Sequence, residues 1–148
     1  ALSLGVGLVA LLLVPLLLVG LSVWSTDGSW EFEGRGVRCW LFIRGSRLAA
    51  LGFVAPTAGA PHYSVRLAEG TFPGWRVATY RSEAAPSDVI AVYASRCRSL
   101  RFKVTEDAAQ DGRGSLVCEI EPYIDVEVGV ERAGDAPAVV NVKVWGDR

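Results

Sequence analysis

The side chains able to do chemistry in this chain are few and far apart. The single histidine, His62, has no second imidazole with which to share a metal ion, and every hydrolytic triad would depend on it. The three cysteines, Cys39, Cys97 and Cys118, lack the CxxC spacing of zinc, iron–sulfur and haem sites. The sequence contains neither a phosphate-binding P-loop nor a GxGxxG motif. We therefore expect no catalytic residue, no cofactor and no metal, and a protein that is not an enzyme.

Two pairs of carboxylates have the spacing that places both members on one face of a strand. They are Glu31 with Glu33 and Glu119 with Glu121. Such pairs permit general acid–base catalysis in principle, but the solvated faces of antiparallel sheets carry them as well. We interpret both pairs as solvated.

An apolar run opens the chain. Eighteen of the first 24 residues are apolar, and the stretch from Leu2 to Trp24 carries no charge. As a helix rising about 1.5 Å per residue it would be roughly 34 Å long, enough to cross a hydrocarbon core of about 30 Å. The run predicts a transmembrane anchor over residues 1–24, kinked at Pro15 and closed by an interfacial Trp24. The alternative is a cleaved signal peptide, for which the run is too long and lacks a basic start.

Beyond residue 24 the composition is that of a globular domain, but the charges are unevenly distributed along the chain. Residues 34–103 carry eleven bases and three acids, and residues 104–148 carry ten acids and four bases. The overall net charge of −1 argues against a nucleic-acid binder. The two regions can neutralise each other within one fold, or the basic one can face anionic lipid.

The region 34–54 mixes arginines with aromatic and aliphatic residues. A strand over 37–44 and a short amphipathic helix over 44–54 are both compatible with its pattern. The mixture suits a membrane interface, where rings lie at headgroup depth and guanidinium groups reach phosphates; a buried hairpin is the alternative. We expect the following residues to contact lipid or a neighbouring subunit: Trp24, Arg35, Arg38, Trp40, Arg44 and Arg47. Residues 55–61 have the composition of a linker.

From position 62 the periodicity is clearer. Alternation predicts strands over 63–68 and 75–81, then from 102 onward, 116–121, 124–131 and 139–145. Ser87 is expected to cap a helix whose apolar stripe is Val89, Tyr93, Cys97 and Leu100. The expected fold class is α+β: a single N-terminal transmembrane helix followed by a mainly antiparallel sheet with one packed helix. The expected domains are an anchor (1–24), a juxtamembrane segment and linker (25–61) and a small α+β domain (62–148).

Two of the cysteines fall where this arrangement can bring them together. Cys97 lies on the helix stripe, and Cys118 lies on the inward face of its strand with Leu116 and Ile120. A body outside the cytoplasm would form a disulfide between them and leave Cys39 free. The alternative is a pair of buried thiols that act as small apolar residues.

The second half of the chain resembles a loose group of small bacterial α+β domains, membrane-anchored or lipoprotein-like, most without an assigned activity. The resemblance covers residues 72–145 and rests on Phe72-Pro73-Gly74, Asp88-Val89, Val92-Tyr93 and Phe102-Lys103-Val104, followed by short alternating strands. At Arg101-Phe102 such domains often carry Gly-Trp. The resemblance implies an extracytoplasmic body, whereas the arginines downstream of the apolar run favour a cytoplasmic one. We favour the extracytoplasmic orientation.

Together these features predict a non-enzymatic single-pass accessory subunit that stabilises a larger bacterial membrane complex, for example a respiratory or photosynthetic assembly. Its expected partners are integral-membrane subunits and membrane lipid, not nucleic acid. Its expected location is the bacterial inner membrane with a periplasmic body. The alternative is a free-standing anchored domain that binds lipid, an envelope polymer or a soluble ligand.

Overall fold

The computed structural model describes residues 28–120 and 124–146. The chain divides into two compact units, Ala1–Trp30 and Glu31–Arg148, and the second holds nearly all of the described residues. The expected anchor over 1–24, with Trp24, lies outside the described residues.

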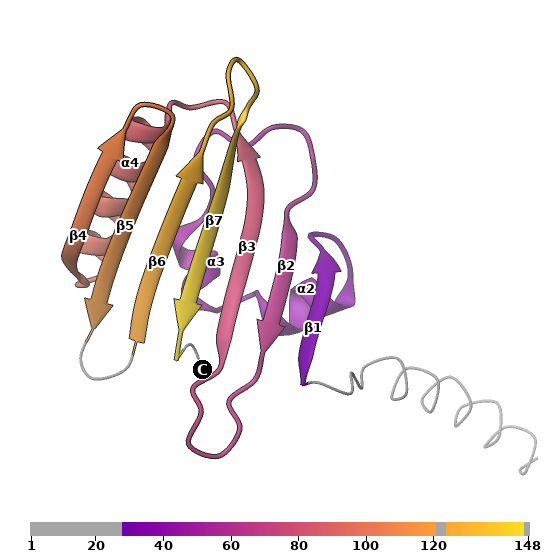
Figure 1. Cartoon of the computed structure of the whole chain (residues 1–148). Helices are drawn as coiled ribbons and strands as arrows, with labels where there is room; N and C mark the ends of the chain where they lie inside the picture. Colours follow the sequence, from indigo (N-terminus) through magenta and orange to yellow (C-terminus); the bar gives the residue numbers. More distant parts are fainter. Residues whose placement is uncertain (1–27, 121–123, 147–148) are drawn as a thin grey trace, which may run out of the picture. The chain divides into compact units, whose positions relative to one another are not determined.

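A seven-stranded sheet organises the molecule (Figure 1). Its strands lie in the spatial order β1-β2-β3-β7-β6-β5-β4, and the registered pairs from β2 to β4 are all antiparallel. The strands are β1 (Ser29–Glu33), β2 (His62–Arg66), β3 (Trp75–Ser82), β4 (Lys103–Gln110), β5 (Arg113–Ile120), β6 (Ile124–Glu131) and β7 (Ala138–Trp145). The helices are α2 (Val37–Phe42), α3 (Arg47–Leu51) and α4 (Pro86–Ser99), and they lie on one side of the sheet.

The core lies between this helix layer and the sheet. Alternation in β7 places Ala138, Val140, Val142 and Val144 toward the helices, all of them buried. The antiparallel register sets these side chains beside those of β6, as where Val128 pairs with Val142. The period-2 pattern of the sequence therefore identifies this buried face correctly.

Helix α4 covers the β4–β6 half of the sheet. It begins at Pro86, with Ala85 as the N-cap, and not after a Ser87 cap as expected, because proline suits the first helical position. The stripe residues Val89, Tyr93 and Cys97 are all buried. The apolar periodicity therefore predicted the packed face of this helix, but not its first residue.

A chain of buried hydrogen bonds ties the segment after α3 to the sheet and to α4. The Val54 backbone N–H donates to the Tyr80 hydroxyl over 3.0 Å. The Tyr80 hydroxyl lies 2.9 Å from the Tyr93 hydroxyl, which donates to the Gly52 carbonyl over 2.7 Å. The Ser82 hydroxyl in turn donates to the Val54 carbonyl over 2.7 Å. Residues 52–54 thus join the core by way of polar groups that are each satisfied.

The expected fold class needs a correction. Within residues 28–120 and 124–146, no helix is long and apolar enough to cross a membrane. In place of a transmembrane helix followed by a sheet with one packed helix, the described residues show a seven-stranded, mostly antiparallel sheet with α4 and two short helices, α2 and α3. Those two helices also resolve the open choice between strand and helix for residues 34–54.

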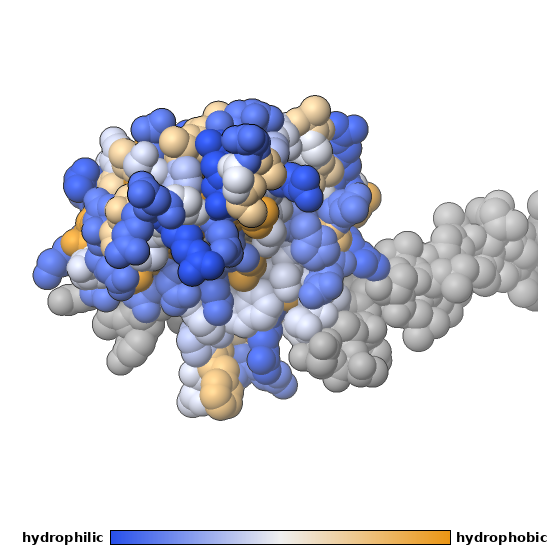
Figure 2. All heavy atoms as spheres, turned by 45° about the horizontal axis from the view of Figure 1, so that its top comes forward, coloured by the Kyte–Doolittle hydropathy of each residue, from blue (hydrophilic) through white to orange (hydrophobic). Residues whose placement is uncertain are grey.

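Hydrophilic side chains dominate the side of the molecule shown in Figure 2, with apolar ones scattered among them. A solvated surface of this kind is normal for a globular domain. Six large apolar side chains are nevertheless exposed among the described residues: Val37, Trp40, Leu41, Leu67, Phe72 and Val139. Three of these belong to α2, a helix of only six residues.

Candidate docking surface

Helix α2 is apolar on nearly all sides. Five of its six residues are apolar, the exception being Arg38. A helix with apolar residues all round is normally buried. Here only one side of the helix is packed against the domain, so apolar side chains on its outer side face solvent.

The inner side of α2 packs on the edge of the sheet. The Phe42 ring lies 6.3 Å from the Phe32 ring, which stacks on Tyr63 at 5.7 Å. Burial, followed by the electrostatic and hydrogen-bond interactions with the neighbouring Cys39, raises the pKa of Tyr63 to about 12. The Arg76 side chain fixes the end of the helix by donating from Nε to the Phe42 carbonyl over 2.8 Å. The inner contacts therefore hold α2 in one orientation.

The outer side presents three large apolar side chains to solvent. Their exposed fractions are 73% for Val37, 58% for Trp40 and 56% for Leu41. At 100° per residue these three positions fall within one arc of the helix, opposite Cys39 and Phe42. A contiguous exposed cluster of this kind marks an interaction site more often than isolated exposed residues do.

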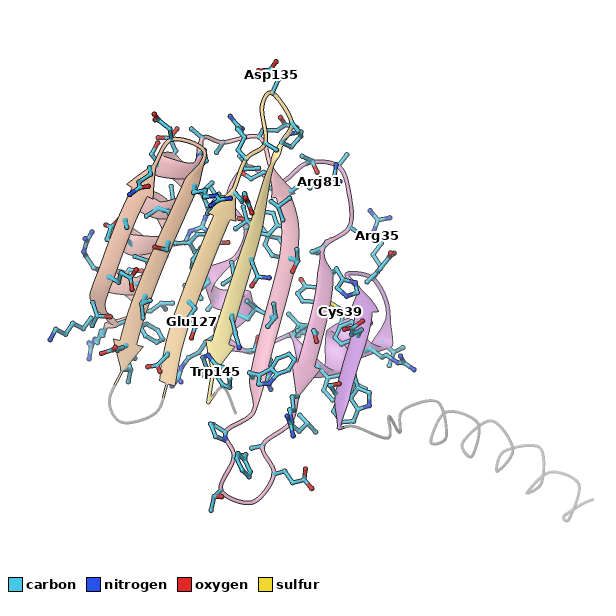
Figure 3. All side chains as sticks on the ribbon, viewed as in Figure 1. Arg35, Cys39, Arg81, Glu127, Asp135 and Trp145 are labelled. Carbon is cyan, nitrogen blue, oxygen red and sulfur yellow. A yellow bond between two sulfur atoms is a disulfide. The ribbon has the colours of Figure 1, made fainter. Side chains whose placement is uncertain are left out.

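The arginines expected at a contact surface divide into two groups. Arg35 and Arg44 are exposed at the two ends of α2, and Arg38 is half-buried within it. Arg47 instead lies in α3 with its guanidinium 6.0 Å from the Phe102 ring centre, a cation–π geometry. Figure 3 shows Arg35 pointing away from the domain and Cys39 at the inner side of α2. We call Arg35, Val37, Trp40, Leu41 and Arg44 the α2 patch.

The contact residues expected from the sequence include Arg35, Arg38, Trp40 and Arg44 but not the aliphatic residues Val37 and Leu41. While the secondary structure of residues 34–54 is left open, these two side chains cannot be distinguished from core residues. A helical assignment for 37–42 would have identified them, because Val37, Trp40 and Leu41 have the i, i+3, i+4 spacing of one helix face.

The part of the chain that the structure describes shows no metal site. No group of three or more His, Cys, Asp or Glu side chains in residues 28–120 and 124–146 is arranged to hold a metal ion. His62 lies 3.8 Å from Glu31, and both side chains are exposed. The expected lack of catalysis and of a cofactor stays a prediction.

Cys97 and Cys118 form a disulfide, with their Cα atoms 6.4 Å apart, and Cys39 is a free thiol. The bond joins α4 to β5 through two fully buried residues. Disulfides persist in oxidising compartments, so this bond points to an extracytoplasmic location.

Comparison with known proteins gives no relative from which to transfer a role: no protein-family model, curated protein or solved structure matches the chain. The expected transmembrane helix is absent from residues 28–120 and 124–146, and that expectation is corrected accordingly. The expected role as an accessory subunit of a larger membrane complex has no support from a homologue and is not tested by the described structure.

Proposed function

We propose that this protein is a non-enzymatic, extracytoplasmic binding domain that docks on an anionic lipid surface through the α2 patch. The observation that carries this proposal is the outward arc of Val37, Trp40 and Leu41 on a helix whose other side is fixed to the sheet. The contact is peripheral, and it requires no membrane-spanning helix.

The composition of the patch favours a lipid interface over an acidic protein surface. An indole ring is amphipathic and prefers headgroup depth, and the aliphatic side chains of Val37 and Leu41 gain from entering the acyl boundary beneath it. Guanidinium groups at both ends of the helix, on Arg35 and Arg44, can bind phosphates bidentately. The patch thus offers an apolar centre with cationic ends.

Charge in the helix layer supports the same orientation. The α2–α3 region and α4 with its C-terminal flank contain one acid, Asp88, and seven arginines: Arg35, Arg38, Arg44, Arg47, Arg96, Arg98 and Arg101. This layer therefore has an excess of positive charge. An anionic surface attracts such a layer at long range, before the apolar side chains make contact.

A fluorophore placed in the patch tests the proposal. The test protein is the full chain with two substitutions, Leu41→Cys and Cys39→Ser. The label therefore attaches at position 41. The matched control places the label at Val139→Cys, an exposed position on the other face of the sheet. Both proteins are mixed with vesicles of phosphatidylcholine alone or with one-third phosphatidylglycerol, each containing nitroxide-labelled lipid as a quencher.

We expect quenching at position 41 in the anionic vesicles, little at position 139, and a decrease at high salt, which screens the arginines. Arg35→Gln with Arg44→Gln should reduce quenching most clearly at low salt. Equal quenching in neutral and anionic vesicles would contradict the charge-based proposal. Absence of quenching at position 41 in both would reject lipid docking and leave an acidic protein as the partner to seek.

A further inference from the structure

The face of the sheet opposite the helices contains a row of small and polar residues that crosses five strands. We call it the open face. The antiparallel registers pair Ala108 with Ser115, Ser115 with Gly129, Gly129 with Asn141, and Asn141 with Thr79. At about 4.8 Å between strands the row is roughly 19 Å long. Larger side chains stand in the rows on both sides of it, so the row forms the floor of a groove.

The groove has a hollow of about 670 Å³ around Gly129. Its lining includes Gln110, Arg113, Ser115, Glu131, Val139 and Asn141. In the wall, the Arg113 guanidinium binds the Glu131 carboxylate through Nε at 3.1 Å and Nη2 at 2.8 Å. The two charges offset each other, so this wall is polar with no net charge.

The glycine at the centre of the floor has no structural explanation within the fold. Gly129 lies in the interior of β6, its φ is not in the left-handed region, and a Cβ added to it would meet nothing within 4 Å. By contrast, a Cβ on Gly114 would lie 2.6 Å from Ile90, so packing of α4 requires that glycine. Glycine weakens a strand interior and often marks a place where a ligand approaches the backbone.

A solvated sheet face accounts for polar side chains, but it does not account for this glycine. Any β-branched residue at position 129 would fit and would favour the strand. The missing side chain leaves the space above Gly129 open, and Ser115 and Asn141 pair with Gly129 from the strands on either side of it. Because the Asn141 amide donates from Nδ2 to the Thr79 hydroxyl over 3.1 Å, its orientation is fixed.

We propose that this groove binds an extended, uncharged glycan. Hydroxyl and amide groups each donate and accept hydrogen bonds, as sugar hydroxyls do, and the groove offers them from Ser115, Asn141, Thr79 and Gln110. A charged polymer gains nothing from the neutral Arg113–Glu131 wall. A peptide that binds by strand addition pairs with a sheet edge, whereas this groove runs across the strands.

The opposite side of the groove continues toward two tryptophans. Trp75 and Trp145 pair directly across β3 and β7, and the ammonium group of Lys143 lies 3.8 Å from the Trp145 ring centre. Trp145 donates from Nε1 to the Glu127 carboxylate over 3.0 Å. Figure 3 shows Glu127 and Trp145 near the lower ends of β6 and β7. These contacts fix a rigid aromatic border, and such preorganisation reduces the entropic cost of binding.

The test fills the groove without harming the fold. In Gly129→Val, the new side chain occupies the hollow and has a high strand propensity. The matched control, Ser64→Val, adds an aliphatic side chain to the same sheet at β2, away from the residues that line the hollow. Binding of cellohexaose, mannohexaose and N-acetylchitohexaose to the full chain is measured by calorimetry and by amide chemical-shift changes in β5, β6 and β7.

We expect at least one of the three hexasaccharides to shift the amides of Ser115, Gly129 and Asn141. Gly129→Val should melt at the same or a higher temperature than the parent protein and bind about tenfold or more weakly, whereas Ser64→Val should bind like the parent. Asn141→Ala should also bind more weakly while remaining folded. Lack of binding to all three sugars, or unchanged binding by Gly129→Val, would overturn the proposal, and neither result bears on lipid docking by α2.

Discussion

The hydroxyl oxygens of Tyr80 and Tyr93 lie 2.9 Å apart in the core, between a strand and a helix that are separated in sequence by the β3–α4 turn. The Tyr80 hydroxyl accepts from the Val54 N–H, 26 residues away, and the Tyr93 hydroxyl donates to the Gly52 carbonyl, 41 residues away. Removal of either hydroxyl leaves a buried backbone group without its partner.

The first prediction concerns this pair. Tyr80→Phe and Tyr93→Phe should each lower the free energy of unfolding by about 1–3 kcal/mol, because a buried polar group becomes unsatisfied. The double variant should lose less than the sum of the two, since the hydroxyls share one network. Urea unfolding of the four proteins measures the coupling. Strict additivity would show that the two hydroxyls act independently.

Stability should also fall in strongly alkaline solution because of Tyr63. Its pKa is raised from 10.0 to about 12 in the folded protein, so folding favours the protonated phenol. The resulting stabilisation is complete below pH 10 and is lost as the pH rises through about 12. Unfolding by urea at pH 9, 10, 11 and 12 should show this decrease, and Tyr63→Phe should flatten it. An equally steep decrease in the variant would assign the effect to other groups.

The acidic end of the open face should be a source of instability at neutral pH. Burial, followed by repulsion from Glu119 and Glu127, raises the pKa of Asp125 above its ordinary value of 3.8. A carboxyl group with a raised pKa stabilises the fold below its unfolded pKa and loses that contribution as the pH rises through its folded pKa. Asp125→Asn should therefore raise the melting temperature at pH 7, with a smaller gain near pH 3. No gain at pH 7 would mean that the repulsion is screened.

The Cys97–Cys118 disulfide closes a loop of 21 residues between α4 and β5. Its removal in the variant Cys97→Ala with Cys118→Ala should destabilise the protein by roughly 3 kcal/mol in the chain-entropy model. Thiol counting on the denatured, unreduced parent protein should find one free thiol, that of Cys39. A count of three would exclude the bond and remove the support for an extracytoplasmic location.

Elements with a regular pattern of apolar residues were predictable from the sequence, because that pattern follows directly from which side chains are buried. Alternation in β6 and β7 and the stripe of α4 each place an apolar side chain at every position that faces the core, so the period alone identifies the element. The same periods brought Cys97 and Cys118 to facing positions. The sequence therefore determined most of the sheet, its long helix and the residues available for a disulfide.

Other features depend on contacts between distant residues, which no local period encodes. Residues 37–42 form a helix, and its outward side follows from the packing of Phe42 and Cys39 near Phe32 and Tyr63. The groove exists only because strand register aligns Ser115, Gly129 and Asn141, and a shift of one residue would send these side chains to the core. Register is set by the packing of the whole sheet, so only the tertiary structure decided where a ligand could bind.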